Sequence, residues 1–319
     1  MTTTVLATPR ILVYSATTEY RHDSIPTAIA ALKELGQKNN IYFDATEDQN
    51  QFNDDSLATY DALLFLSNSG EGSFGVLFLT FTDKPREVLN ESGKQAFQNY
   101  LNKGGNYIGI HAASACLFNT TFYQKQVGAL FDYHPELQPV TFVVIDKNHP
   151  STSMLPDRWI YTEEVYNFRS DPRTVGAQVI LSVDESSYTD TGVRNYTQGT
   201  PHPIAWYQEH GAGAEDPSSA GRSFYTSLGH LSSTWEDQNF LAHVLGGIQW
   251  TLASNTTRAM NADGKVGALP DGGITSTSSG AESTSTGGPT PNGARSSSVS
   301  TGIALAALPA TFVSMVWLS

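Results

Sequence analysis

Histidines and one pair of glutamates are the residues of this chain whose types and positions could perform chemistry. His111 directly follows the apolar run YIGI (107–110) and precedes three small residues, AAS (112–114). This layout is typical of a sharp turn from a strand into a helix, where enzymes present a nucleophilic serine or cysteine at the mouth of a sheet. Here the position holds an imidazole. Other candidate polar residues at expected strand ends are His22, Glu163, Glu164, His202 and His230.

Imidazole and carboxylate groups together support two kinds of chemistry. They can transfer protons near neutral pH, or they can hold a divalent metal ion such as zinc through nitrogen and oxygen ligands. No HExxH or His-x-His pair fixes a metal site, so both remain open, as does a structural role in which the His111 ring joins neighbouring loops. Adjacent side chains of a strand face opposite ways, so we expect Glu164, and not Glu163, in the cleft. The expected catalytic residues are His22, His111, Glu164 and His230, and the expected metal ligands are His22, His111 and Glu164.

The elements that must position these residues follow from the apolar pattern. Short apolar runs predict strands at 11–15, 41–46, 62–67 and 107–110, separated by helices at 25–36, 53–60 and 92–101, and another helix reaches about residue 127. The second half predicts strands at 140–145, 176–183, 203–208 and 222–228, and a last helix at 240–252. This alternation indicates a doubly wound α/β fold with a mostly parallel sheet, in a single globular domain over 10–253. Ligands bind such sheets beyond the C-terminal strand ends, where the candidate residues fall.

Charge and motif content exclude several partners. The net charge of −13 argues against nucleic acid and against an electrostatic membrane patch. No Gly-x-Gly-x-x-Gly follows the first strand, so we expect neither a nicotinamide nor a flavin cofactor. Cys116 is the single cysteine, which excludes an internal disulfide. We expect it to be a small core residue in the helix after the turn.

The C-terminal part differs in composition from the rest. Residues 254–301 are rich in Ser, Thr, Gly and Pro, which predicts a disordered stalk. The uncharged tail 302–319 follows a polar spacer and the small residues Asn292, Gly293 and Ala294. This pattern indicates a signal for a glycosylphosphatidylinositol (GPI) anchor, with attachment at Asn292, or at Gly293 as second choice. A C-terminal membrane helix is the alternative, but the tail is short, contains Pro309 and lacks flanking cations.

The N-terminal segment 1–9 conflicts with the anchor interpretation. A GPI anchor requires entry into the secretory pathway, but MTTTVLATPR has no basic and no apolar signal region. Either the signal is missing from this sequence or the interpretation of the tail is wrong. Four Asn-x-Ser/Thr sites favour secretion, and we expect a glycoprotein at the extracellular face of the cell membrane. These sites are Asn90, Asn119, Asn195 and Asn255.

A series of short motifs between Arg10 and Leu252 resembles one known family. The motifs YRHDSI, GGNYIGIHAA, NHPSTSMLP, TEEVYNF, HPIAW and GRSFYTSLGH occur in this order. Together they resemble the ThuA-like (trehalose-utilisation) domain of the class I glutamine-amidotransferase-like superfamily. The resemblance implies a flavodoxin-like fold with a pocket at the turn, and it places His22, His111, Glu164 and His230 at positions that match the family's motifs. Amidotransferase relatives have Gly-x-Cys-x-Gly at the turn, whereas this chain has GIHAA (109–113), so glutaminase chemistry is not expected.

The same resemblance implies a carbohydrate as the substrate class. An aromatic platform for a sugar ring could come from Tyr166 or Trp206, and His202 could also contact the substrate. The chain has Glu-Glu where the family usually has Asp-Glu, and an insertion at about 70–90 is expected to lengthen a loop over the pocket. Two hypotheses follow: an enzyme that acts on a carbohydrate or polyol, and a surface-displayed binding module that has lost its chemistry. The substrate, the metal and the oligomeric state do not follow from the sequence.

Overall fold

The computed structural model describes residues 7–70 and 87–268. A nine-stranded sheet forms its centre, with the order β2-β1-β3-β5-β13-β12-β11-β8-β9. Neighbours from β2 to β13 are parallel, and the pairs from β13 to β9 are antiparallel. The strands of the parallel half are β2 (Tyr42–Thr46), β1 (Arg10–Tyr14), β3 (Ala62–Leu66), β5 (Asn106–Ile110) and β13 (Ser223–Thr226). Those of the antiparallel half are β12 (Pro203–Gln208), β11 (Gln178–Val183), β8 (Gln138–Val144) and β9 (Arg158–Glu163).

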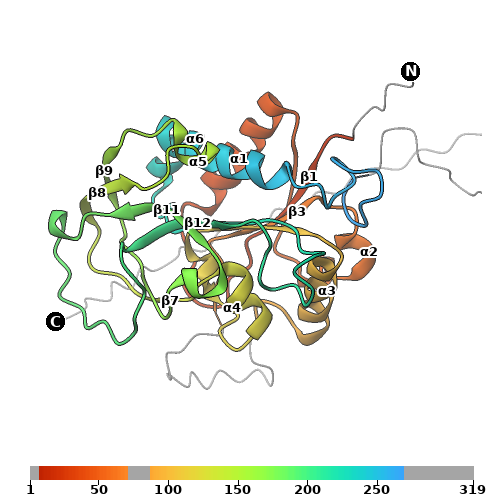
Figure 1. Cartoon of the computed structure of the whole chain (residues 1–319), viewed down its shortest axis with the longest axis horizontal. Coiled ribbons are helices and arrows are strands. Elements are labelled where there is room, and N and C mark those ends of the chain that lie inside the picture. Colours follow the sequence, from red (N-terminus) through yellow and green to blue (C-terminus); the bar gives the residue numbers. More distant parts are fainter. Residues whose placement is uncertain (1–6, 71–86, 269–319) are drawn as a thin grey trace, which may run out of the picture. The chain divides into compact units, whose positions relative to one another are not determined.

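Helices cover both faces of this sheet (Figure 1). Helices α1 (Ile25–Asn39), α5 (Pro150–Ser153) and α6 (Gln238–Leu252) lie on one face, and α2 (Asp54–Leu57), α3 (Glu91–Asn102) and α4 (Thr121–Val127) lie on the other. Strands β3 and β5 are buried along their whole length because both of their faces are covered. Two separate apolar cores result, one on each side of the sheet. The expected flavodoxin-like α/β fold is therefore confirmed.

Several elements differ from the pattern that the sequence predicts. His111 is not followed directly by a helix: a 3₁₀ turn (His111–Ser114) and the short strand β6 (Ala115–Cys116) come first, and α4 begins only at Thr121. Cys116 is buried, as expected, but it lies in β6 and not in a helix. β6 pairs with β4 (Ser69–Gly70), and β7 (Phe131–Tyr133) pairs with β10 (Asn167–Phe168). These strands have two or three residues, too few for apolar alternation to reveal them.

The folded domain also extends past the boundary expected at 253. Residues 254–268 pack against it: Val266 is fully buried, the Arg258 backbone N–H donates to the Val266 carbonyl, and the Ala268 backbone N–H donates to the Asp61 carboxylate. The first residues of the expected stalk therefore belong to the domain. The later stalk, the tail and most of the expected insertion at 70–90 lie outside the described residues. Within 7–70 and 87–268, no helix has both the length and the apolar character needed to cross a membrane.

Candidate functional site

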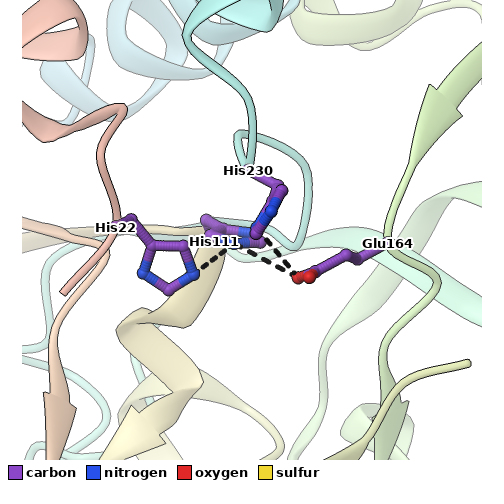
Figure 2. A group of neighbouring side chains, drawn as sticks. All are labelled: His22, His111, Glu164 and His230. Atoms are coloured by element: carbon purple, nitrogen blue, oxygen red, sulfur yellow. Dashed lines mark hydrogen bonds and ion pairs between the residues drawn. The ribbon is translucent and has the colours of Figure 1, made fainter. Parts of the chain in front are cut away.

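Four side chains from distant parts of the sequence point toward one another beyond the ends of the parallel strands (Figure 2). His22 comes from the loop after β1, His111 from the end of β5, Glu164 from the end of β9 and His230 from the loop after β13. One nitrogen or oxygen atom of each lies within 4.8 Å of those of the other three. The structure thus brings together all four residues of the expected catalytic set, including His230, which the expected set of metal ligands omitted.

His111 lies at the centre of this group and is completely buried. Its φ of +55° is in the left-handed region, which is uncommon for a residue with a side chain and fits a sharp turn at a strand end. Its Nδ1 lies 2.7 Å from the Ser227 carbonyl oxygen. Because a carbonyl only accepts hydrogen bonds, Nδ1 must be protonated. Burial, followed by the neighbouring His22, holds the pKa of His111 well below its usual value, so the ring is neutral and Nε2 presents a lone pair.

The Nε2 atom of His111 faces three polar groups. His22 Nε2 and the Tyr166 hydroxyl each lie 3.0 Å away, and Glu164 Oε2 lies 3.6 Å away. Burial, followed by the charge of His230, lowers the pKa of His22 to about 4, so this ring is also neutral at physiological pH. The pKa of Tyr166 is raised well above its usual value by burial and by the charge of Glu164. Tyr166 is therefore a neutral hydroxyl that can donate a hydrogen bond to His111.

Glu164 connects the inner histidines to the opening of the site. Its Oε2 lies 3.2 Å from His230 Nδ1, and its Oε1 lies 3.4 Å from His134 Nε2. Burial alone would lower the pKa of His230, but the adjacent Glu164 carboxylate outweighs it and raises that pKa. His134 Nδ1 donates to the Pro135 carbonyl over 2.8 Å, which turns Nε2 toward Glu164. The site thus contains a further histidine that the expected set did not include.

Glu163, next in sequence, faces away from the site and holds one of its loops. Its carboxylate accepts hydrogen bonds from the backbone N–H groups of Gly229 (3.0 Å), His230 (3.3 Å) and Glu164 (3.1 Å), and from the Thr234 hydroxyl (3.3 Å). Burial raises the pKa of Glu163 to about 7, although the bond from Gly229 opposes this shift. The expected alternation of the pair is therefore observed: Glu164 enters the site, and Glu163 fixes the loop that positions His230.

A cavity of about 520 Å³ opens over this group, which is within the usual range for small-molecule sites. His22, Glu164 and His230 line one end of it. Phe118, Phe131 and Tyr166 give it an aromatic wall, with the rings of Phe131 and Tyr166 4.5 Å apart. Asp132 and Arg169 add a carboxylate and a guanidinium that are 3.9 Å apart.

Two expected substrate-binding residues lie elsewhere. Trp206 is 1% exposed, packs against Tyr225 in the core and donates its indole N–H to the Val127 carbonyl, and it does not line the cavity. The prediction that Trp206 offers a platform is corrected, because its β12 strand is covered on that face by α4. His202 is also buried outside the cavity, where its Nε2 donates to the Tyr166 carbonyl over 2.9 Å. It supports Tyr166, which does line the cavity as expected.

Comparison with known proteins places this architecture in a family. The family model described as "Trehalose utilisation", ThuA, matches residues 10–251. The chain belongs to the ThuA family. The fold of this ThuA domain is similar to that of a ThuA-like protein from Bacteroides uniformis, with a TM-score of 0.59 and 20% sequence identity, covering 79% of this chain and 94% of the other. A ThuA-like protein from Parabacteroides merdae gives 0.55 and 16%, covering 77% and 90%. No curated protein matches the chain.

Proposed function

We propose that this ThuA domain is an enzyme that binds a carbohydrate or related polyol in the cavity and transfers protons at its hydroxyl groups. The observation that supports this most directly is the placement of a buried His/Glu group at one end of a cavity with an aromatic wall. Rings such as Phe118 and Phe131 can pack against the apolar face of a sugar. The family name points to the same substrate class.

The polar groups of the cavity suit a neutral ligand with many hydroxyls. The Arg169 guanidinium and the Asp132 carboxylate form a loose pair, and Arg169 Nε is buried without a hydrogen-bond partner within 7–70 and 87–268. Burial raises the pKa of Asp132, although Arg169 opposes this shift. Such a pair offers donors and acceptors side by side, as neighbouring sugar hydroxyls require. The net charge of the pair is close to zero, so it does not select an anionic ligand.

Proton transfer in this cavity can run through Glu164 and His134. The side chain of His134 is 36% exposed, whereas that of His111 is completely buried. His134 can therefore exchange protons with solvent, while Glu164 bridges it to the inner histidines. A general acid or base needs this combination of contact with the site and access to bulk water.

The proposal is tested by exposing the full-length protein to mono- and disaccharides and cyclic polyols, including glucose, trehalose and myo-inositol. Saturation-transfer NMR reports binding, and one-dimensional proton spectra report turnover over hours. We expect one or more ligands to bind and change, with binding weakened in Phe118→Ala and Asp132→Asn. Tyr42→Ala, an exposed aromatic residue on β2 outside this cavity, is the matched control. Binding without turnover would favour a non-catalytic binding module, and no binding by any ligand would contradict the proposal.

We also propose that the domain is displayed on the outer face of the cell membrane through a GPI anchor. The composition of 302–319 and the small residues at 292–294 support this. Three of the glycosylation sites, Asn119, Asn195 and Asn255, have exposed side chains, and Asn90 is half-buried at the start of α3. Release of the protein from cells by phosphatidylinositol-specific phospholipase C, lost when Asn292 and Gly293 are replaced by bulky residues, is the expected result. Protein that resists the phospholipase would contradict the anchor.

A further inference from the structure

We propose that His22, His111, Glu164 and His230 form a centre for one divalent metal ion, with zinc as the ion that fits them best. This inference rests on the proposed function in one respect only: it assigns a cofactor to the same cavity. The four groups supply three imidazoles and one carboxylate and no thiolate. Nitrogen-rich sets of this kind suit zinc and its first-row neighbours, whereas calcium and magnesium take oxygen ligands.

The protons available to the four groups cannot satisfy them all. His111 Nε2 must present a lone pair, because its Nδ1 proton goes to the Ser227 carbonyl. The Tyr166 hydroxyl can donate to that lone pair, but His22 Nε2 lies equally close to it. Glu164 Oε2 is a further acceptor at 3.6 Å. His111 Nε2 and Glu164 Oε2 are therefore two acceptors that face one another in a buried place. A cation between them would be stabilised.

The two outer histidines add to this imbalance. Among the residues that the structure describes, His22 Nδ1 is buried and has no hydrogen-bond partner. His230 Nδ1 also has no hydrogen-bond partner among those residues, although it lies only 3.2 Å from Glu164 Oε2. A metal ion placed between His230 Nδ1 and Glu164 Oε2 would contact both of them.

Three of the separations between the ligand atoms are close to those around a small cation. Zinc bound to nitrogen and oxygen at about 2.0–2.2 Å in a tetrahedron holds its ligand atoms roughly 3.3–3.6 Å apart. The distances here are 3.0 Å between the Nε2 atoms of His22 and His111, 3.2 Å between His230 Nδ1 and Glu164 Oε2, and 3.6 Å between His111 Nε2 and Glu164 Oε2. The largest separation in the group is at most 4.8 Å. Small rotations of the side chains would close the site.

The surroundings of the group are those of a supported metal centre. The Ser227 carbonyl fixes the tautomer and orientation of His111, which is the usual outer support of a metal-bound histidine. Glu163 fixes the backbone of His230. His22, Glu164 and His230 line the cavity, whereas His111 lies behind them. A bound ion would therefore be reached by ligand from the cavity side, where it could act as a Lewis acid.

Metal uptake by the full-length protein tests the inference without a substrate. Protein stripped with EDTA and dialysed against zinc is analysed for metal content, and cobalt is titrated while the visible absorption of four-coordinate Co²⁺ is followed. We expect one ion per chain. Glu164→Gln and His230→Gln should weaken binding at least about 100-fold, more than the loss of an outer supporting group. Both residues border the cavity, so these variants should fold even where His111→Ala does not.

His210→Gln is the matched control, because His210 is exposed and outside the group of four. Near-ultraviolet circular dichroism verifies that every variant is folded. Wild-type protein that takes up no zinc or cobalt would overturn the inference, as would uptake that Glu164→Gln and His230→Gln leave unchanged. Stoichiometric metal binding by protein that neither binds nor changes any saccharide would support the inference and count against the proposed function. Saccharide turnover by wild-type protein that takes up no metal would support the proposed function and overturn the inference.

Discussion

The adjacent residues Glu163 and Glu164 should separate stability from function when each is replaced by alanine. Glu163 is completely buried and accepts the backbone N–H groups of Gly229 and Glu164, both of which lie in the interior. Glu164 contacts only histidine side chains through its ion pairs, and no backbone N–H of the described residues donates to it. One variant therefore removes the support of a loop, and the other removes a contact of the site.

The magnitude follows from the donors that Glu163→Ala leaves without a partner. A buried polar group that loses its hydrogen bond costs about 1–3 kcal/mol. The N–H groups of Gly229 and Glu164 together give about 2–6 kcal/mol, a large part of the roughly 5–15 kcal/mol that stabilises a typical domain. Glu164→Ala strands no backbone donor, and we expect it to change the free energy of unfolding by less than about 1 kcal/mol.

Urea denaturation followed by tryptophan fluorescence measures both variants. At pH 6 the Glu163 carboxyl is mostly neutral, because burial raises its pKa to about 7, so the loss reports stranded donors and not the removal of a charge. With an m-value of about 2.5 kcal/mol per molar, a loss of about 4 kcal/mol lowers the midpoint by about 1.5 M. Glu163→Gln keeps the shape and should lose less. Equal losses in Glu163→Ala and Glu164→Ala, or a loss below about 1 kcal/mol in Glu163→Ala, would refute the reasoning.

Three further predictions follow from the same contacts. The free energy of unfolding should fall as the pH drops from about 6.5 to 4, by up to about 3 kcal/mol for each histidine, because burial lowers the pKa values of His22, His149 and His243 to about 4 while the unfolded chain takes up protons near 6.5. His243→Asn should reduce the change of unfolding free energy with pH, measured by urea titrations, and a pH dependence that the variant leaves unchanged would contradict the prediction. Gly229→Ala should cost about 1–3 kcal/mol and weaken metal binding, since Gly229 has a φ of +130° and its new Cβ would lie 3.4 Å from His111 Cβ. Gly176→Ala, also at positive φ but with no atom of the described residues beyond its chain neighbours within 4 Å of its Cβ, should cost stability and leave metal uptake intact. Equal uptake by both variants would argue against coupling between Gly229 and His111. Trp206→Phe should lower stability by about 1–3 kcal/mol through its lost bond to the Val127 carbonyl without changing saccharide affinity, whereas a drop in affinity would restore Trp206 as a ligand contact.

Local sequence patterns were sufficient for most of the large elements. The apolar runs of β3 and β5 and the helical spacing in α1 and α6 identify these elements because each buries one continuous surface. Strand alternation also predicted that Glu164, and not Glu163, would enter the site, since the two side chains of adjacent strand residues must face opposite sides. The rule that ligands bind beyond strand ends selected His22, His111 and His230, because the end of a parallel strand is a local property.

Other residues of the site could not be predicted from the sequence pattern. Asp132 and His134 lie on or directly after β7, and Arg169 directly after β10. These strands are too short to show a period, so the ribbon that provides a wall of the cavity could not be seen in advance. Trp206 shows the opposite error: its residue type suggested a sugar platform, but its strand is covered on both faces.

The sequence by itself determined the fold class, the turn at His111 and which glutamate of the pair is presented, because each depends on neighbours a few residues apart. Only the tertiary structure decided which of these groups meet. β9 is the last strand in the order of the sheet, four places from β13, yet Glu163 at its end bonds to Gly229 and His230 beyond β13. That contact joins residues 66 apart in sequence, and no local pattern encodes it. It arises because the buried carboxylate and the loop's N–H groups have to satisfy one another, and it brings Glu164 within reach of three histidines.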